Sequence, residues 1–217
     1  FRYGPELPWV LRDVDLTIRR GERIGIVGET GSGKSTLVDL LMGLLEPTIG
    51  EFQVDGEPVR GEQLRRWRGA IAHVPQSIFL ADASIAENIA FGVPKGAIDQ
   101  ARLKQACQQA QISGLISSLE RGYDTGVGER GVRLSGGQRQ RIGIARALYK
   151  RAAVLVFDEA TSALDHGTET EVMEAIDSLS TDLTIVMIAH RLSTLERCDR
   201  LLTVKQGQLQ AAQTIQR

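Results

Sequence analysis

The sequence has little of what stabilises small secreted proteins or anchors membrane proteins. Cysteine occurs only at Cys107 and Cys198, too far apart for a CxxC pair, so a disulfide framework or a cysteine-rich zinc site is not expected and a reducing compartment fits better. No apolar run approaches the roughly 18 residues of a membrane span, and we expect no signal peptide. The sequence begins at Phe1 without methionine, so we expect a segment of a longer protein.

Net charge is also small. The 26 basic and 27 acidic residues leave a formal charge of −1, so the molecule has no overall field for capturing nucleic acid, and we expect no nucleic-acid partner. Hydrophobic residues make up 42% and charged residues 24%, which is typical of a globular chain and excludes a disordered one. A chain of 217 residues predicts one domain with a sub-lobe.

Glycine, in contrast, is abundant. The sequence has 23 glycines but only 6 prolines, and many of the glycines fall in clusters at 28–33, 126–131 and 136–137. Flexible linkers would carry serine and proline as well. Short glycine clusters between periodic segments indicate loops where backbone approaches a ligand closely.

The hydrophobic pattern predicts an α/β fold. Apolar runs and alternation predict a hairpin over 51–59 and strands over 10–18, 23–27, 71–74, 152–157 and 183–189. Helices are predicted over 36–45, 99–112 and 168–179, the second of them within a mainly helical insertion of about 78–150. Strand, helix and strand in succession over 152–189 indicate a parallel sheet.

Residues 28–35, GETGSGKS, match the complete phosphate-loop pattern GxxxxGK[ST] between a predicted strand and a predicted helix. Glycines let backbone N–H groups surround a phosphate chain, and the helix N-terminus adds positive potential. Lys34 can reach the terminal phosphates, and the Ser35 hydroxyl can ligate Mg²⁺. The alternative is a chance glycine turn before a helix. The predicted nucleotide-binding residues of this loop are Gly28, Glu29, Thr30, Gly31, Ser32, Gly33, Lys34, Ser35 and Thr36.

Residues 153–159, AVLVFDE, place two carboxylates after an apolar strand. Ligands of open parallel sheets bind beyond the carboxyl ends of the strands. Asp158 is therefore predicted to hold Mg²⁺ through water, and Glu159 to orient or deprotonate an attacking water. The alternative is the solvated start of a loop.

Two further side chains follow predicted strands. His190 directly follows the run at 183–189 and is predicted to sense the γ-phosphate, against the alternative of a structural histidine. Gln76 follows the strand at 71–74 after Pro75, and its neutral amide can bridge Mg²⁺ or the attacking water, although a surface glutamine is the default interpretation. With Lys34 and Glu159 these residues form the predicted catalytic set.

A second glycine turn precedes a helix at 134–138, LSGGQ, which is followed by RQRIGIARAL. It is a second anion-binding N-terminus. One chain with two such elements can use both if two chains meet head to tail, so that the second element of one covers the nucleotide held by the first element of the other. The alternative is an ordinary capped helix whose arginines are solvated.

The segments GETGSGKST, LSGGQRQRIGIARAL, VFDEATSALD and AHR, in this order, resemble the ATP-binding cassette (ABC) family over essentially the whole chain. The resemblance implies a RecA-like phosphate-loop NTPase core with a mainly parallel sheet, an N-terminal antiparallel β subdomain and an inserted α-helical subdomain. Residues 1–77 and 151–217 would form the β and core parts, and 78–150 the helical part.

The same resemblance implies further roles. Tyr3 would stack on adenine, although an N-terminal aromatic is otherwise a packed edge residue. Gln76 would be the Q-loop and Ser162 to Asp165 the D-loop. Ser135, Gly137 and Gln138 would act on the nucleotide of a second cassette.

Two motifs resemble exporters, whose membrane helices precede the cassette in one polypeptide. These are SIAENIAFG at 84–92 and GVGERG at 126–131, where Gly126 stands in place of the usual acidic residue. The pattern is also similar to bacterial lipid and lipid-linked oligosaccharide flippases. It implies Mg-ATP hydrolysis coupled to transport at the cytoplasmic face of a bacterial inner membrane, with a second cassette and a transmembrane domain as partners.

Other functions stay open. An importer ATPase would be distinguished by what lies upstream of Phe1. A DNA-maintenance ATPase of cassette type would carry a long coiled-coil insertion between phosphate loop and LSGGQ, and sustained heptads are missing there. A non-catalytic regulatory cassette is disfavoured because Lys34, Asp158, Glu159 and His190 are all in the sequence.

Overall fold

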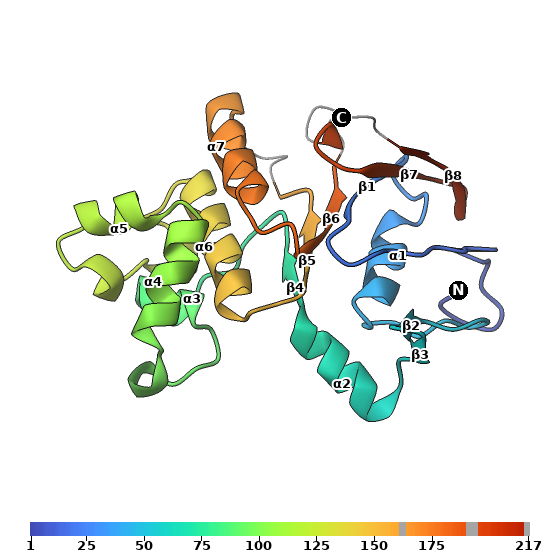
Figure 1. The fold of residues 1–217 in the computed structure, drawn as a ribbon, viewed down its shortest axis with the longest axis horizontal. Coiled ribbons are helices and arrows are strands. Elements are labelled where there is room, and N and C mark those ends of the chain that lie inside the picture. The colour runs from blue at the N-terminus through green and yellow to red at the C-terminus, as the bar shows by residue number, and fades with distance from the viewer. Residues whose placement is uncertain (161–163, 190–194, 215–217) are drawn as a thin grey trace. The chain divides into compact units, whose positions relative to one another are not determined.

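The computed structural model describes residues 1–160, 164–189 and 195–214, which form an α/β fold (Figure 1). Its strands are β1 (Arg23–Val27), β2 (Gln53–Val54), β3 (Glu57–Pro58), β4 (Ile71–Val74), β5 (Val154–Asp158), β6 (Thr184–Ile188), β7 (Arg200–Lys205) and β8 (Gln208–Thr214). Its α-helices are α1 (Lys34–Leu41), α2 (Gly61–Ala70), α3 (Ile85–Ile89), α4 (Gln100–Gln109), α5 (Ser113–Ser118), α6 (Gly136–Tyr149) and α7 (His166–Asp177). Short 3₁₀ turns are η1 (Lys95–Ala97), η2 (Gly122–Asp124) and η3 (Glu129–Gly131).

The sheet is mixed and mostly parallel around its centre. Six strands follow the order β4-β5-β6-β1-β7-β8, and β2 with β3 forms a separate antiparallel hairpin. β1 runs parallel to β6, with Arg23 opposite Ile185, and parallel to β7, with Val27 opposite Thr203. β8 is antiparallel to β7. Every residue of β6 is buried, as expected for a strand covered on both faces. The predicted fold class is confirmed.

The chain forms two compact units. The first comprises residues 1–72, 153–156 and the described residues from 181 onward, and the second comprises 73–152 and 157–180. The subdomain boundaries that the sequence suggests near 78 and 150 stay predictions.

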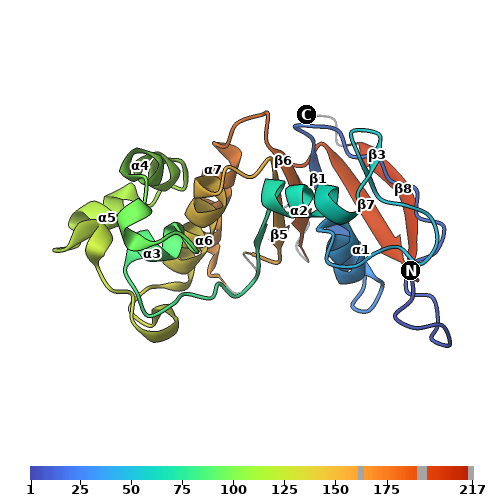
Figure 2. The ribbon, with the colours of Figure 1, turned by 90° about the horizontal axis from the view of Figure 1, so that it is seen from below.

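In the first unit, α1 lies against strands β1 and β7 (Figure 2). Ile24 and Ile26 of β1 are completely buried and belong to one apolar cluster with Leu37 and Val38 of α1. The strand predicted over 10–18 is wrong: its alternating apolar side chains are half-buried against this core, but no strand forms. Asp13 adopts a φ of 51°, which interrupts the extended backbone a ladder needs.

The second unit is built around α6, which packs against α3, α4 and α7. Its interior includes Ile85, Leu103, Ile142 and Ile144, all completely buried. Polar side chains begin the helices: Ser84 and Glu87 form a capping box on α3, Asp99 caps α4 and Asp165 caps α7, each satisfying backbone N–H groups of a first turn. The helical insertion predicted from the sequence is confirmed.

Other elements differ from the expectation. The helix predicted over 36–45 runs from Lys34 to Leu41, and Gly43 beyond it has a φ of 67°, typical of a helix end. Helix α2 was not predicted, because its sequence, GEQLRRWRGA, is mostly polar, although Leu64 and Trp67 at helical spacing are partly buried and Trp67 packs against the core of the first unit. Strands β7 and β8 were also not predicted. No helix in the described parts of the chain is long and apolar enough to cross a bilayer.

Candidate functional site

The loop between β1 and α1 has the backbone of an anion cradle. Gly28, Gly31 and Gly33 have φ values of 154°, 78° and 108°, which favour glycine. A Cβ on Gly28 would lie 2.3 Å from the Val204 carbonyl oxygen, and one on Gly33 would lie 2.9 Å from Leu11 Cδ2. Gly33 is the N-cap of α1 and supplies no side chain to the first-turn N–H groups. These donors are therefore available for an anion.

Lys34 places a buried ammonium inside this loop. Its Nζ donates to the carbonyl oxygens of Gly28 at 2.7 Å and Glu29 at 2.9 Å, and the residue is 7% exposed. An ammonium has three N–H donors, so one remains for a phosphate oxygen. The two carbonyl bonds hold the charge where the loop amides converge.

The hydroxyls of the loop differ in their surroundings. Ser32 Oγ is buried and has no hydrogen-bond partner among the described residues, so its O–H can donate to an anion in the loop. Ser35, Glu29 and Thr30 are exposed, and Ser35 can offer its oxygen to a cation. Thr36 is buried. This donor set fits a polyphosphate with a divalent cation.

Tyr3 lies beside α1. Its hydroxyl and Thr36 Oγ1 are 3.2 Å apart and hydrogen-bonded. The ring of Phe1 packs edge-on against the Tyr3 ring, with centroids 4.9 Å apart. The Tyr3 side chain nevertheless stays 58% exposed. An accessible aromatic ring is thus anchored next to the phosphate loop, and its role in adenine stacking stays a prediction.

The two carboxylates predicted to act on metal and water belong to the second unit. Asp158 is the last residue of β5, and Glu159 follows it with a φ of 49°. This left-handed conformation costs a non-glycine residue on the order of 1 kcal/mol or more. Such strain clusters at active sites, because the surrounding structure holds a side chain in one required direction. Both residues are partly exposed.

Gln76 follows β4 and is exposed, while its main chain is held from α6. The Gln140 Nε2 atom donates to the Gln76 carbonyl oxygen at 2.6 Å. The structure therefore connects the predicted Q-loop to the helix that begins with the LSGGQ turn.

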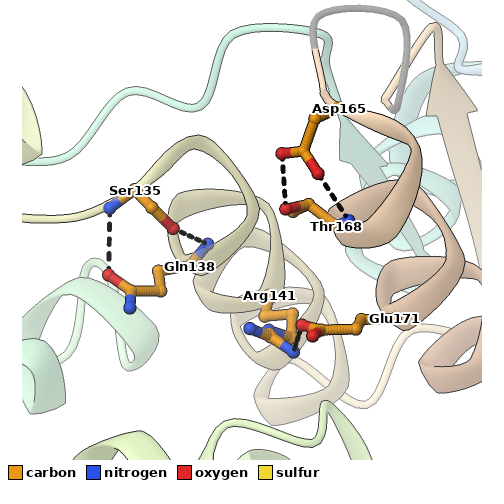
Figure 3. A network of polar contacts seen from close by, with 6 residues as sticks. All are labelled: Ser135, Gln138, Arg141, Asp165, Thr168 and Glu171. Carbon is orange, nitrogen blue, oxygen red and sulfur yellow. Dashed lines mark hydrogen bonds and ion pairs between the residues drawn. The ribbon is translucent and has the colours of Figure 1, made fainter.

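The LSGGQ turn forms the N-terminus of α6 (Figure 3). Ser135 Oγ accepts from the Gln138 N–H at 3.2 Å, and the Ser135 N–H donates to Gln138 Oε1 at 2.9 Å. This capping box orders the turn and uses part of the Gln138 side chain within its own helix. Ser135 stays exposed, so its hydroxyl is accessible from outside the chain.

Helix α7 supports this turn from the side. A Cβ on Gly137 would lie 2.0 Å from Thr168 Cγ2. One turn along, Arg141 Nη1 forms an ion pair of 2.8 Å with Glu171 Oε2 (Figure 3). Gly137 is therefore required for helix packing as well as for the predicted approach to phosphate.

Two predicted features lie outside the described residues. His190 is one, and Ser162, the first residue of the predicted D-loop, is the other. Both stay predictions. Asp165, the last residue of that loop, is described and caps α7.

Sequence reasoning missed Gln140 and Thr168. Within α6, Gly137, Gln140, Ile144 and Ala147 are buried at helical spacing, so a glutamine interrupts an otherwise apolar stripe. That signal was available in the sequence. The nearness of Thr168 to Gly137 was not, because it depends on how two helices pack.

A family model described as "ABC transporter" matches residues 11–162. The chain is 44% identical over 215 residues to an ATP-dependent lipid A-core flippase of Ralstonia nicotianae. The aligned region covers 99% of this chain and 36% of the relative. A protein of the same name from Chromohalobacter salexigens is 46% identical over 209 residues, covering 96% of this chain and 36% of the relative.

A solved structure agrees. The bacterial Atm1-family ABC exporter with ATP bound superposes with a TM-score of 0.85 at 37% identity, covering 99% of this chain and 37% of the exporter chain. The chain thus spans about a third of the length of the proteins it matches. It belongs to the ABC transporter family and has the fold of that family's nucleotide-binding ATPase domain.

Proposed function

We propose that this chain is the motor domain of an ABC exporter, which binds and hydrolyses Mg-ATP in a head-to-tail pair. The observation that supports this most directly is the Lys34 ammonium, 7% exposed and held between two carbonyl oxygens of a glycine loop. Burying a cation destabilises the folded state unless an anion and hydrogen bonds compensate for the lost hydration. A triphosphate is the partner that matches both the charge and the surrounding N–H groups.

Within this proposal, the phosphate loop neutralises the β- and γ-phosphates through Lys34, the loop amides and the Ser32 hydroxyl. Tyr3 offers its ring to the adenine. Within the described ranges, no group of three or more His, Cys, Asp or Glu side chains can hold a metal ion. In this proposal Ser35, Gln76 and Asp158 would hold Mg²⁺ together with phosphate oxygens, and the ion would neutralise charge developing on those oxygens.

Glu159 performs the proton chemistry of the proposed reaction. Its carboxylate orients a water molecule and accepts a proton as the water oxygen attacks the γ-phosphorus. The bond from that phosphorus to the bridging oxygen of ADP then breaks. His190 is proposed to contact the γ-phosphate and Gln76 to contact Mg²⁺ or the water. Phosphoryl transfer needs mainly positioning and charge neutralisation, which these groups supply.

The second half of each site would come from another cassette. Ser135 is exposed at the first turn of α6, where backbone N–H groups favour an anion. Ser135, Gly137 and Gln138 would cover the triphosphate bound by the partner's phosphate loop. ATP would then join two cassettes, and hydrolysis would release them.

A groove in the second unit supports coupling to a membrane partner. It has a volume of about 850 Å³ and is lined by Ser77, Ile78, Phe79, Glu129, Arg130, Val132 and Arg139. Phe79 is 62% exposed and Val132 is 77% exposed. Exposed apolar side chains rimmed by charges are typical of a protein interface. We propose that this surface receives the transmembrane domain.

The relatives also support proposals about the whole protein. They are named lipid A-core flippases, and this chain spans about a third of their length. We propose a transmembrane domain N-terminal to this segment in the same polypeptide, a location at the cytoplasmic face of a bacterial inner membrane, and a lipid or glycolipid as the transported molecule.

Phosphate release tests this proposal. The chain should release phosphate from ATP only with Mg²⁺, and Glu159→Gln should bind ATP but turn over roughly 10²- to 10⁴-fold more slowly, because it lacks the base. Glu159→Gln should also elute at twice the mass of the 23.7 kDa chain when Mg-ATP is present. Turnover of Glu159→Gln near the wild-type rate would contradict the role given to Glu159.

A further inference from the structure

Gln140 is a buried polar residue in the middle of α6. It is 4% exposed, and its Nε2 donates to the Gln76 carbonyl oxygen at 2.6 Å and to the Pro75 carbonyl oxygen at 3.3 Å. Both acceptors belong to the segment directly after β4. The amide thus contacts the main chain of the predicted Q-loop.

The carbonyl oxygen of the Gln140 side chain, in contrast, makes no hydrogen bond to the described residues. This atom, Oε1, is buried. A buried acceptor left without a partner destabilises the folded state, and an apolar side chain of similar size would avoid that cost. Such an exception calls for an explanation. The explanation that the structure offers is the donation from Nε2 to the carbonyl oxygens of Gln76 and Pro75, of which the bond to Gln76 is the shorter.

The same helix contacts the Q-loop segment at a second point. A Cβ on Gly143 would lie 2.5 Å from Ile78 Cδ1 and 3.6 Å from Val74 Cγ1. Val74 precedes Gln76 and Ile78 follows it. The segment is therefore held against α6 on both sides of Gln76 as well as at the Gln76 carbonyl.

The N-terminus of α6 is the LSGGQ turn. Gln138, which closes the capping box with Ser135, lies only two residues before Gln140. An α-helix is stiff over such a distance, so the Gln76 main chain and the Ser135 turn share one rigid support. Gln76 itself is exposed, while α6 holds its main chain through the Gln140 amide.

We infer that Gln140 is a positioning residue, which fixes Gln76 relative to the LSGGQ turn. The inference rests on the proposed function, in which Gln76 acts on Mg²⁺ and water in one site and Ser135 on the triphosphate of the other. Gln140 fixes the position of Gln76 relative to Ser135, because it lies on the same helix, α6, that begins at Ser135. Losing it lets the Gln76 main chain move while the phosphate loop stays intact.

Gln140→Met tests this in the full chain. Methionine has a similar length but lacks the N–H donors and the unpartnered oxygen. The kcat for ATP should fall about fivefold, comparable to the loss of one hydrogen bond. The Mg²⁺ concentration for half-maximal rate should rise several-fold, the KM for ATP should change less than about twofold, and the melting temperature should not fall.

A double-mutant cycle with Gln76→Ala decides whether Gln140 acts through Gln76. The double variant should be no slower than Gln76→Ala alone. The matched control is Ile144→Val, which removes a buried methylene group from the same helix. It should lower the melting temperature and leave kcat unchanged. Combined with Gln76→Ala, it should lower the melting temperature by the same amount as it does alone and leave the kcat of Gln76→Ala unchanged.

The outcomes separate the two claims. If Gln140→Met retains wild-type kcat and Mg²⁺ dependence while Gln76→Ala is impaired, or if the two effects multiply, the inference is overturned and the proposed function stands. If Gln76→Ala turns over at the wild-type rate, the proposed role of Gln76 fails, and the inference with it. Should Gln140→Met not fold by circular dichroism, Gln140→Leu provides the same comparison.

Discussion

Gly137 and Thr168 approach each other so closely that a methyl group on the glycine would lie 2.0 Å from the threonine Cγ2 atom. The contact joins the first turn of α6 to the first turn of α7. Thr168 is itself fixed, because its hydroxyl donates to Asp165 Oδ2 at 2.7 Å. Asp165, which ends the predicted D-loop, therefore supports the LSGGQ turn indirectly, by holding Thr168 against Gly137.

This contact predicts the effect of enlarging Gly137. Gly137→Ala should lower the free energy of unfolding by about 1–3 kcal/mol, because the added methyl group overpacks the helix interface. Thr168→Ser removes the Cγ2 atom but keeps the hydroxyl. The double variant should recover most of the loss, since the next nearest Thr168 atom lies 3.5 Å from the added carbon. Urea denaturation measures both, and equal stabilities of the single and double variants would refute the packing role.

Lys34 is expected to control nucleotide affinity. Lys34→Ala should weaken ATP binding by roughly 10- to 100-fold, because charge-assisted hydrogen bonds to the phosphates are lost. Lys34→Arg is the matched control for charge. Its planar guanidinium does not fit a position with carbonyl oxygens at 2.7 Å and 2.9 Å, so it should also bind weakly. Calorimetric titration with ATP measures both, and wild-type affinity in Lys34→Ala would contradict the assignment.

The backbone at Glu159 predicts a gain in stability when function is lost. Glycine adopts a φ of 49° without the cost that Glu159 bears, so Glu159→Gly should raise the free energy of unfolding by on the order of 1 kcal/mol. Hydrolysis should be lost in the same variant, because the base is gone. Glu159→Gln also lacks the carboxylate but keeps the left-handed backbone, so it is the reference for this comparison. A Glu159→Gly variant that is less stable than Glu159→Gln would mean that the backbone at this position is not strained.

Asp165 predicts a pH dependence at the start of α7. The hydrogen bonds from the Thr168 hydroxyl and backbone N–H hold the pKa of the Asp165 carboxyl below its ordinary value of 3.8. A lowered folded-state pKa contributes stability that is complete above 3.8 and lost as pH falls through the folded value. Asp165→Asn keeps a good N-cap without a titrating group.

The melting temperature of the wild type should therefore fall more steeply than that of Asp165→Asn as pH is lowered from about 5 to about 2.5. Other carboxylates titrate in both proteins, so the difference between the two curves isolates Asp165. Parallel curves would show that the cap contributes no pH-dependent stability.

Parts of this molecule with local signals could be predicted from the sequence. The pattern GETGSGKS lies between an apolar strand and a helix, and the structure has β1 and α1 there. The polar strand β8, QLQAAQT, carries no such pattern, because its formation depends on the neighbouring strand β7 rather than on its own periodicity. Helix α2 offers only Leu64 and Trp67 as a weak local signal in a mostly polar segment. The φ of Glu159 and the contact between Gly137 and Thr168 depend on tertiary packing, so the sequence does not reveal them.

Complementation between two inactive variants tests the central claim most directly. Lys34→Ala disables the phosphate loop. Ser135→Asp places a negative charge against the triphosphate while aspartate keeps α6 well capped. In a head-to-tail pair, a mixed dimer of the two has one intact composite site and one doubly disabled site.

Each variant alone should release almost no phosphate from Mg-ATP. An equal mixture should regain up to about a quarter of wild-type activity, because about half of randomly formed dimers are mixed and each has one working site. Activity of the mixture that does not exceed the sum of the two variants, at concentrations where wild type is active, would contradict a nucleotide site shared between two chains.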